Sequence, residues 1–277
     1  MLGTGTPVTD TKRAGASVAV IHAGKAYVFD IGAGAVRNII RARQQLGIKE
    51  LGSRPLDPPG VCCLFLTHLH SDHTLDYVEL VNTLWWRRDE QLRAFGPAGL
   101  QDMSDGMYQL MQPDVKIRTS GLQPVKHPDF YRAQVTEIEG GFVFEENGIR
   151  IEAFDVPHGD IEPAFGYKVT TQDKSIVISG DTAYSETILE KARGVDLLIH
   201  EVISEKGLST RSEFWQKYHR AAHTPASDLG RLAAVAKPGK LVLYHALFYG
   251  VSEDQLLNEV RAHYDGEVIL ANDLDIF

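Results

Sequence analysis

The chain of 277 residues has few cysteines and no long apolar run. Its two cysteines, Cys62 and Cys63, are adjacent, and the sequence offers no other partner for a disulfide. Successive side chains of a strand point to opposite faces, so we expect these thiols not to pair and to be small core residues. No apolar stretch reaches the roughly 20 residues that span a bilayer. A disulfide-stapled scaffold and a membrane partner are therefore not expected.

The sequence also lacks a linker rich in proline, glycine and serine, a low-complexity segment and an internal repeat. We therefore predict one domain over residues 1–277, although the length alone would allow two small ones. Hydrophobic residues make up 43% of the chain and charged residues 23%. This composition is typical of a globular protein with a sizeable core.

An excess of positive charge is missing as well. The chain has 37 acidic and 28 basic residues, which gives a formal net charge of −9. Two divalent cations would leave it acidic. Proteins that neutralise many phosphates normally present a basic face. The charge of the whole chain therefore argues against a long nucleic acid as the substrate.

The sequence contains no direct sign of a compartment. Its first residues, MLGTGTP, form a glycine turn with almost no strand in front of it, whereas such a turn normally follows a strand. Upstream residues, including a signal peptide, are therefore one explanation. The default expectation is a cytoplasmic protein, and a periplasmic or secreted one if such a segment has been removed.

Short β-rich runs alternate with amphipathic stretches along the chain. Strands are expected at residues 17–22, 25–30, 61–66, 93–95, 134–138, 149–154, 165–170, 175–179, 196–200, 240–245 and 267–270. Helices are expected at residues 35–46, 74–86, 185–191, 226–236 and 253–263, with one more ending near residue 110. This order suggests an α/β fold with two sheets packed face to face and helices on their outer faces.

Chemistry-bearing side chains stand at the ends of these strands. The heptapeptide THLHSDH, residues 67–73, directly follows the apolar run 61–66. The other such residues are Asp30, His158, Asp181, Glu201 and His245. Imidazole and carboxylate suit zinc, manganese and iron, so this pattern indicates a metal site. A polar cluster without metal is disfavoured, because so many buried charges need a cation to organise them.

The ordered motifs resemble those of the metallo-β-lactamase superfamily. THLHSDH matches its HxHxDH signature, and DVPHG, SGDT and LYHALF resemble, in order, its third-histidine, bridging-aspartate and last-histidine motifs. The resemblance covers essentially the whole chain. It implies an αββα four-layer sandwich, in which helices flank two mixed β-sheets and metals bind at one edge.

The resemblance also implies two divalent metal ions, with zinc expected and manganese or iron as alternatives. The ligands of one ion would be His68, His70 and His158. The ligands of the other would be Asp72, His73 and His245, with Asp181 bridging both. Two ions that share a hydroxide provide a nucleophile at neutral pH, and Asp72 would orient it.

A second pair of motifs narrows the chemistry. HEVISEKG and AAHTPASDLGRLA resemble two motifs of the tRNase Z branch and of related arylsulfatases. By that resemblance Glu201 orients His223, which faces the leaving group and assists departure of the alcohol. From the residues alone, His223 could instead contact a nearby helix end, and Glu201 could be a solvated carboxylate at a strand end.

The long arm with which tRNase Z proteins grip tRNA has no counterpart in this chain. That arm lies between a GY pair and the strand before SGDT, where this chain has only the short turn TTQDK, residues 170–174. The better match is the arm-less group of arylsulfatases and small-substrate phosphodiesterases. We therefore predict a binuclear metal-dependent hydrolase of small phosphodiesters or aryl sulfates.

Three alternatives to this prediction stay open. The same metal centre could serve a lactonase or β-lactamase-type hydrolase, or a tRNase Z-type ribonuclease, which the missing arm disfavours. The chain could also be a non-catalytic metal-binding protein. Some members of the fold form dimers, so a homodimer is a further possibility.

Two other groups of residues have less specific interpretations. The WWRR segment, residues 85–88, could line a pocket mouth, but we prefer a helix end with tryptophan packed inward and solvated arginines. Four histidines are interpreted as ordinary surface or core residues, namely His22, His127, His219 and His263.

Overall fold

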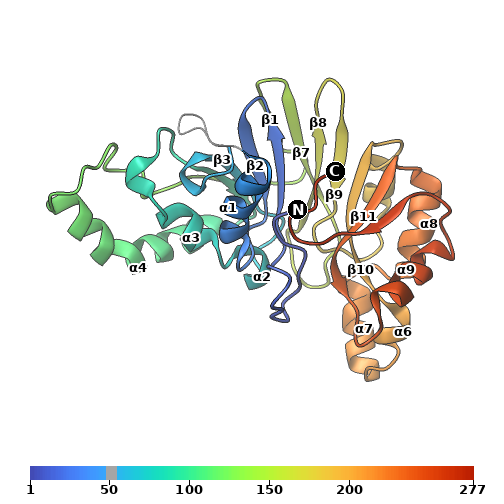
Figure 1. Ribbon diagram of the computed structural model, residues 1–277. Coiled ribbons are helices and arrows are strands. Elements are labelled where there is room, and N and C mark those ends of the chain that lie inside the picture. Colours follow the sequence, from blue (N-terminus) through green and yellow to red (C-terminus); the bar gives the residue numbers. More distant parts are fainter. Residues whose placement is uncertain (48–54) are drawn as a thin grey trace. The chain divides into compact units, whose positions relative to one another are not determined.

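The computed structural model describes residues 1–47 and 55–277. The chain divides into two compact units. The first unit comprises Met1–Gly3, Pro7–Ile138 and Asp273–Phe277, and the second comprises Thr4–Thr6 and Glu139–Asn272. Each unit contains one β-sheet with its own helices (Figure 1). One domain over the whole chain stays a prediction.

The first unit contains a five-stranded mixed sheet in the order β1-β2-β3-β4-β5. Its strands are β1 (Val18–His22), β2 (Lys25–Phe29), β3 (Val61–Phe65), β4 (Arg93–Gly96) and β5 (Gln134–Glu137). Its helices are α1 (Ala35–Gln45), α2 (Ser71–Thr74), α3 (Tyr77–Asn82), α4 (Leu100–Ser120) and the 3₁₀ turns η1 (Pro58–Gly60) and η2 (Trp85–Arg87). Only β1 and β2 pair antiparallel. Every residue of β3 is buried, as its continuous apolar sequence indicates.

The second unit contains a seven-stranded mixed sheet in the order β12-β11-β10-β9-β8-β7-β6. Its strands are β6 (Val143–Glu146), β7 (Ile149–Asp155), β8 (Phe165–Thr170), β9 (Ser175–Ile178), β10 (Leu197–Ile203), β11 (Lys240–Leu247) and β12 (Val268–Leu270). Its helices are α5 (Glu186–Lys191), α6 (Glu205–Leu208), α7 (Glu213–Ala222), α8 (Ala226–Ala236) and α9 (Glu253–Arg261). Strands β6–β9 form an antiparallel meander, and β9–β12 are parallel and joined through helices.

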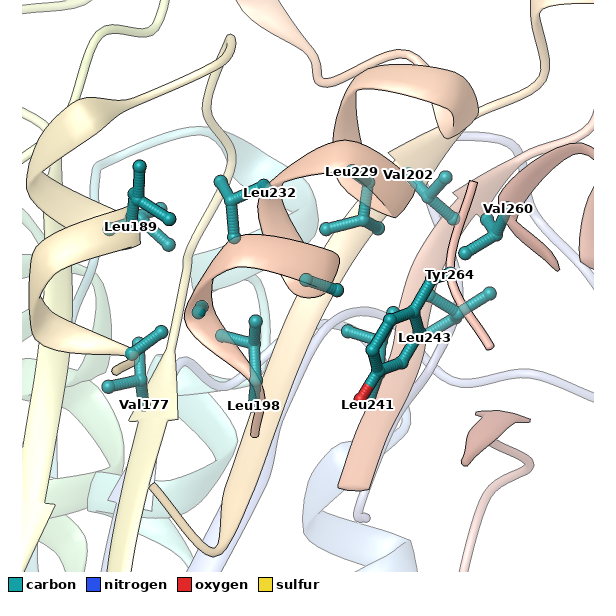
Figure 2. Packing of buried hydrophobic residues seen from close by; sticks show 14 of the residues in the cluster. Val177, Leu189, Leu198, Val202, Leu229, Leu232, Leu241, Leu243, Val260 and Tyr264 are labelled. Atoms are coloured by element: carbon teal, nitrogen blue, oxygen red, sulfur yellow. The ribbon is translucent and has the colours of Figure 1, made fainter. Parts of the chain in front are cut away.

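The core of the second unit fixes the strands that carry site residues. Leu229 and Leu232 of α8 pack with Leu198 of β10 and with Leu241 and Leu243 of β11 (Figure 2). Full burial of one such side chain contributes about 1.5–3 kcal/mol. The packing therefore holds β10 and β11 in place, the strands that contain Glu201 and His245.

The predicted fold class is confirmed, because both sheets are mixed and helices accompany each. The hairpin of β1 and β2 and the bounds of β8 and α8 agree with the sequence pattern. The short connection between β8 and β9 is also confirmed: in residues 171–174 the Thr171 N–H donates to the Lys174 carbonyl at 2.8 Å. Among the described residues, no helix has the length and apolar character required to cross a bilayer.

The prediction of one helix over residues 74–86 is wrong. In this segment α2 ends at Thr74, and two separate elements, α3 and η2, follow it. The backbone N–H of Asp76 donates to the Ile31 carbonyl at 3.0 Å instead of to a carbonyl one turn earlier. Leu84 then enters the left-handed region at φ 55°. Leu75, in the break between α2 and α3, is 59% exposed.

The cysteine side chains do not point to opposite faces. Strand β3 bulges at Cys62, because Ala26 pairs with Val61 and Tyr27 pairs with Cys63. A bulge re-aims a side chain, and the two sulfur atoms lie 2.7 Å apart. Both cysteines are buried and form no disulfide, as predicted.

The prediction that the arginines of the WWRR segment are solvated is wrong for Arg88. Trp85 is buried as expected, but Arg88 is buried too. Its guanidinium donates to the carbonyls of Pro58, Pro59, Val61 and Leu80. Arg88 therefore joins η1 to α3 and is not a solvated cation.

Other elements differ from the expectation in length or presence. Helix α4 continues ten residues past the expected end near residue 110, and β10 continues to Ile203 instead of ending at His200. The longer β10 places Glu201 inside a strand. Strand β6 and helices α6 and α7 were not expected from the sequence pattern.

Candidate metal centre

The first unit carries one set of donor side chains in the turn after β3. His68 and His70 precede α2, and Asp72 and His73 lie in it. The distance from His68 Nε2 to His70 Nδ1 is 3.0 Å, and from Asp72 Oδ2 to His73 Nε2 it is 3.5 Å. The His68 and His73 ring centroids are 4.2 Å apart. The four predicted ligands of this turn therefore lie together.

Asp30, at the end of β2, holds this turn in place. Its Oδ2 accepts a hydrogen bond from His73 Nδ1 at 2.8 Å, and its Oδ1 accepts one from the Thr67 N–H at 2.8 Å. Asp30 is buried, with φ at 56°, a conformation that aspartate tolerates better than most residues. A carboxylate on Nδ1 selects the tautomer whose Nε2 can bind a metal.

The backbone beneath the turn is packed too closely for a side chain. A Cβ atom at Gly32 would lie 2.1 Å from the Asp72 carbonyl oxygen. The Ile31 N–H also donates to the His73 carbonyl at 2.8 Å. Glycine at this position therefore lets α2 approach the segment after β2.

The second unit carries the other donor set, at the ends of four elements. His158 follows β7, Asp181 follows β9, His245 lies in β11 and His223 caps the C-terminus of α7. The ligand atoms of His158, Asp181 and His223 lie within 4.8 Å of one another. His245 Nδ1 is 3.4 Å from Asp181 Oδ1. All four side chains are buried.

His158 has one nitrogen committed to the backbone. Its Nδ1 lies 2.8 Å from the Ala222 carbonyl oxygen, so it donates there and leaves Nε2 for a ligand. This is the same arrangement as His73 with Asp30. Hydrogen bonds of this kind orient histidines that bind metals.

Glu201 and His223 lie together in the second unit. Glu201 Oε2 is 3.5 Å from His223 Nδ1, and Oε1 accepts the Thr224 N–H at 2.7 Å. Burial raises the pKa of the Glu201 carboxyl above its usual range, and the nearby His223 opposes this. Glu201 is fully buried, so its interpretation as a solvated carboxylate is wrong. The roles of the pair stay predictions.

Two further buried histidines lie beside this pair. His200 Nδ1 donates to the Glu201 carbonyl at 2.6 Å, and His219 Nε2 lies 2.5 Å from the Tyr249 hydroxyl. Burial lowers the pKa of both imidazoles to about 4. Both rings are therefore neutral at neutral pH.

Sequence reasoning missed the surroundings of His223. Its ring centroid lies 5.5 Å from that of His219, which in turn lies 5.7 Å from that of Trp215. The sequence does contain a signal for this arrangement, namely the spacing of four residues. Arg211, Trp215, His219 and His223 are each four residues apart, which is the repeat of one helical face.

Comparison with known proteins identifies the family. The beta-lactamase superfamily domain matches residues 27–246, most of the chain. This chain belongs to the β-lactamase superfamily. The superfamily recognised from the motifs is therefore confirmed, and with it the class of metal-dependent hydrolases.

Relatives within the superfamily match nearly the whole chain. Ribonuclease Z of Mycobacterium marinum (strain ATCC BAA-535 / M) is 27% identical over 281 residues, covering 99% of this chain and 95% of the relative. The metallo-beta-lactamase fold protein YhfI from Bacillus subtilis has a TM-score of 0.72 at 17% identity, covering 98% and 95%. Human tRNase Z, short form, has a TM-score of 0.67 at 21% identity, covering 100% and 96%. The two structures show the metallo-β-lactamase fold.

The donor chemistry in both units fits the divalent metal ions that the superfamily implies. Each set combines imidazole with carboxylate, and the side chains are buried apart from the half-buried His70. Buried carboxylates and imidazoles in such density are stable when a cation compensates them. The hydrogen bonds at Nδ1 of His73 and at Nδ1 of His158 orient these two rings so that Nε2 can bind a metal.

Proposed function

We propose that this chain is a binuclear metal-dependent phosphodiesterase that hydrolyses small anionic esters. The observation that carries the proposal is the buried pair of Glu201 and His223, 3.5 Å apart, with His158, Asp181 and His245 close to His223. A phosphodiester needs such a group because its alkoxide leaving group must gain a proton. Superfamily membership supports the hydrolytic chemistry.

The proposed ligands are those implied by the superfamily resemblance. One ion takes His68, His70 and His158. The other takes Asp72, His73 and His245, with Asp181 shared. Zinc is the proposed metal, because imidazole-rich sets with carboxylates suit it.

Asp72, Glu201 and His223 have different roles in the proposed reaction. Bound divalent ions supply Lewis acidity to the ester oxygens and lower the pKa of the attacking water. Asp72 accepts a hydrogen bond from that water and orients it. Glu201 holds Nδ1 of His223 and stabilises its protonated form, so that Nε2 is the nitrogen that donates a proton to the departing oxygen.

The name ribonuclease Z of the curated relatives supports phosphodiester bonds as the target. It also makes tRNA processing the second candidate. Two observations favour the small substrate: only residues 171–174 join β8 and β9, and the chain has a net charge of −9.

Aryl sulfates are the third candidate, because their leaving groups benefit from the same assistance by His223. Lactones and β-lactams depend less on such assistance. They become the leading substrates only if esters of phosphate and sulfate fail.

The first test compares substrates on protein loaded with zinc. We expect turnover of bis-p-nitrophenyl phosphate to exceed that of p-nitrophenyl sulfate and of a tRNA precursor with a 3′ trailer, and a chelator to abolish it. The His223→Ala variant should lose about 10²–10⁴-fold with alkyl leaving groups and much less with p-nitrophenolate. Two bound metals without turnover of any phosphodiester would overturn the proposal, and equal losses on both leaving groups would remove the role of His223.

A further inference from the structure

Helix α7 in the second unit presents three aromatic side chains to solvent. Phe214 is 73% exposed, Trp215 50% and Tyr218 43%. Single exposed apolar residues are ordinary, but a contiguous group of them marks a binding surface. The Trp215 ring contacts both neighbours, with centroids 5.6 Å from Phe214 and 5.7 Å from Tyr218. The three rings therefore form one patch.

A series of rings leads from this patch to His223. The centroids of Trp215 and His219 are 5.7 Å apart with ring planes at 26°, and those of His219 and His223 are 5.5 Å apart at 32°. Two ring-to-ring steps thus separate an exposed tryptophan from the proposed proton donor.

The His219 ring, between Trp215 and His223, is held in place by Tyr249. The Tyr249 hydroxyl lies 2.5 Å from His219 Nε2, and the Arg211 guanidinium lies over the Tyr249 ring at 4.7 Å. A Cβ atom at Gly207 would lie 2.2 Å from the Phe248 carbonyl oxygen, so the turn after β11 packs directly on α6. These contacts hold His219, the ring on which Trp215 stacks.

The segment that carries the patch is basic in an otherwise acidic chain. The net charge of the whole chain is −9, whereas residues 205–220 contain twice as many cations as carboxylates. The cations are Lys206, Arg211, Lys217 and Arg220, and the carboxylates are Glu205 and Glu213. The patch therefore suits a ligand that is aromatic and negatively charged.

We propose that Trp215 and Tyr218 form a stacking subsite for an aromatic ring on the leaving-group side of the substrate, either a nucleobase or a simple aryl ring. The inference rests on the proposed function, because the leaving-group side is defined by His223. Aromatic stacking strengthens binding of one base by roughly 5- to 100-fold. The subsite thus selects anionic esters that carry a ring over those that do not.

The test measures binding by calorimetry on zinc-loaded protein. The three ligands are adenosine 5′-monophosphate, phenyl phosphate and ethyl phosphate. Trp215→Ala should weaken the two ring-bearing ligands about tenfold and change ethyl phosphate less than about twofold. Trp215→Phe should keep most of the affinity. Trp86→Ala, a partly exposed tryptophan of the first unit, is the matched control and should change nothing.

The outcomes of this test show whether the bound ring is a nucleobase or any aryl ring. They also separate failure of the subsite from failure of the proposed phosphodiesterase activity. A loss confined to the nucleotide identifies a nucleobase, and equal losses identify any aryl ring. Equal weakening of all three ligands, unchanged ring affinity, or no binding at all overturns the subsite. A dimer that dissociates in Trp215→Ala while ring affinity is unchanged also overturns it and assigns the patch to a second copy. Ring-selective loss in a protein without phosphodiesterase turnover supports the subsite and rejects only the proposed function.

Discussion

Asp30 is a residue whose importance depends on three hydrogen bonds. The sequence shows only a carboxylate at a strand end. In the structure Oδ2 accepts from His73 Nδ1 and from the Thr67 hydroxyl, and Oδ1 accepts from the Thr67 N–H, each at 2.8 Å. Because the negative charge holds Nδ1–H of His73, Nε2 is left for the metal. Asp30 therefore acts through His73 as a positioning residue.

Removing this charge should weaken the metal site without unfolding the protein. In Asp30→Asn the amide oxygen keeps the bond from the Thr67 N–H, but an NH2 group replaces Oδ2, the acceptor of the Thr67 hydroxyl and of His73 Nδ1–H, so the favoured tautomer is lost. We expect zinc affinity to fall about 10- to 100-fold, measured by competition with a fluorescent chelator. The exposed Asp105→Asn is the control. Equal zinc affinity in the wild type and Asp30→Asn would show that Asp30 does not position His73.

At the scale of elements, close backbone contact decides where the metal-binding turn lies. The hydrophobic spacing over residues 74–86 predicts a single helix, but the Asp76 N–H is taken by Ile31, outside that helix. A periodic pattern reports which side chains are apolar, and it contains no information about a backbone donor captured by another segment. Conversely, helix α7 was missed although Trp215 and His219 lie four residues apart in it, with Arg211 and His223 at the same spacing on either side. The reason is that these side chains are aromatic or basic and do not form an apolar pattern.

The contact of Gly32 with α2 offers a test at this scale. In Gly32→Ala the new Cβ would meet the Asp72 carbonyl oxygen, so α2 must move. We expect a loss of about 1–3 kcal/mol in the free energy of unfolding, measured in urea, together with reduced zinc content. Gly106→Ala in α4 is the matched control, because no atom lies within 4 Å of its Cβ and alanine favours a helix by about 0.5–1 kcal/mol. Full zinc content in Gly32→Ala would show that the turn tolerates the displacement.

At the scale of the whole molecule, bound metal and stability should be coupled. The buried carboxylates and imidazoles of both donor sets are compensated when cations bind, and a ligand that binds only the folded state raises its stability. We expect a chelator to lower the melting temperature by several degrees and added zinc to restore it, since a binding energy of a few kcal/mol shifts Tm by this order. Asp181→Ala should melt at the same temperature with and without chelator. A wild type that melts identically in both conditions would contradict the coupling.

The amino-acid order by itself determined the superfamily and the fold class, and it pointed to the side chains that could hold metal. Those features follow from local spacing, such as three histidines and an aspartate in the seven residues 67–73. Only the tertiary structure decided how donors are oriented and what surrounds them: Asp30 on His73, the Ala222 carbonyl on His158, and the rings between Trp215 and His223. The physical reason is that the spacing of residues records chemistry along one segment, whereas orientation and burial depend on hydrogen bonds and packing between segments far apart in the chain.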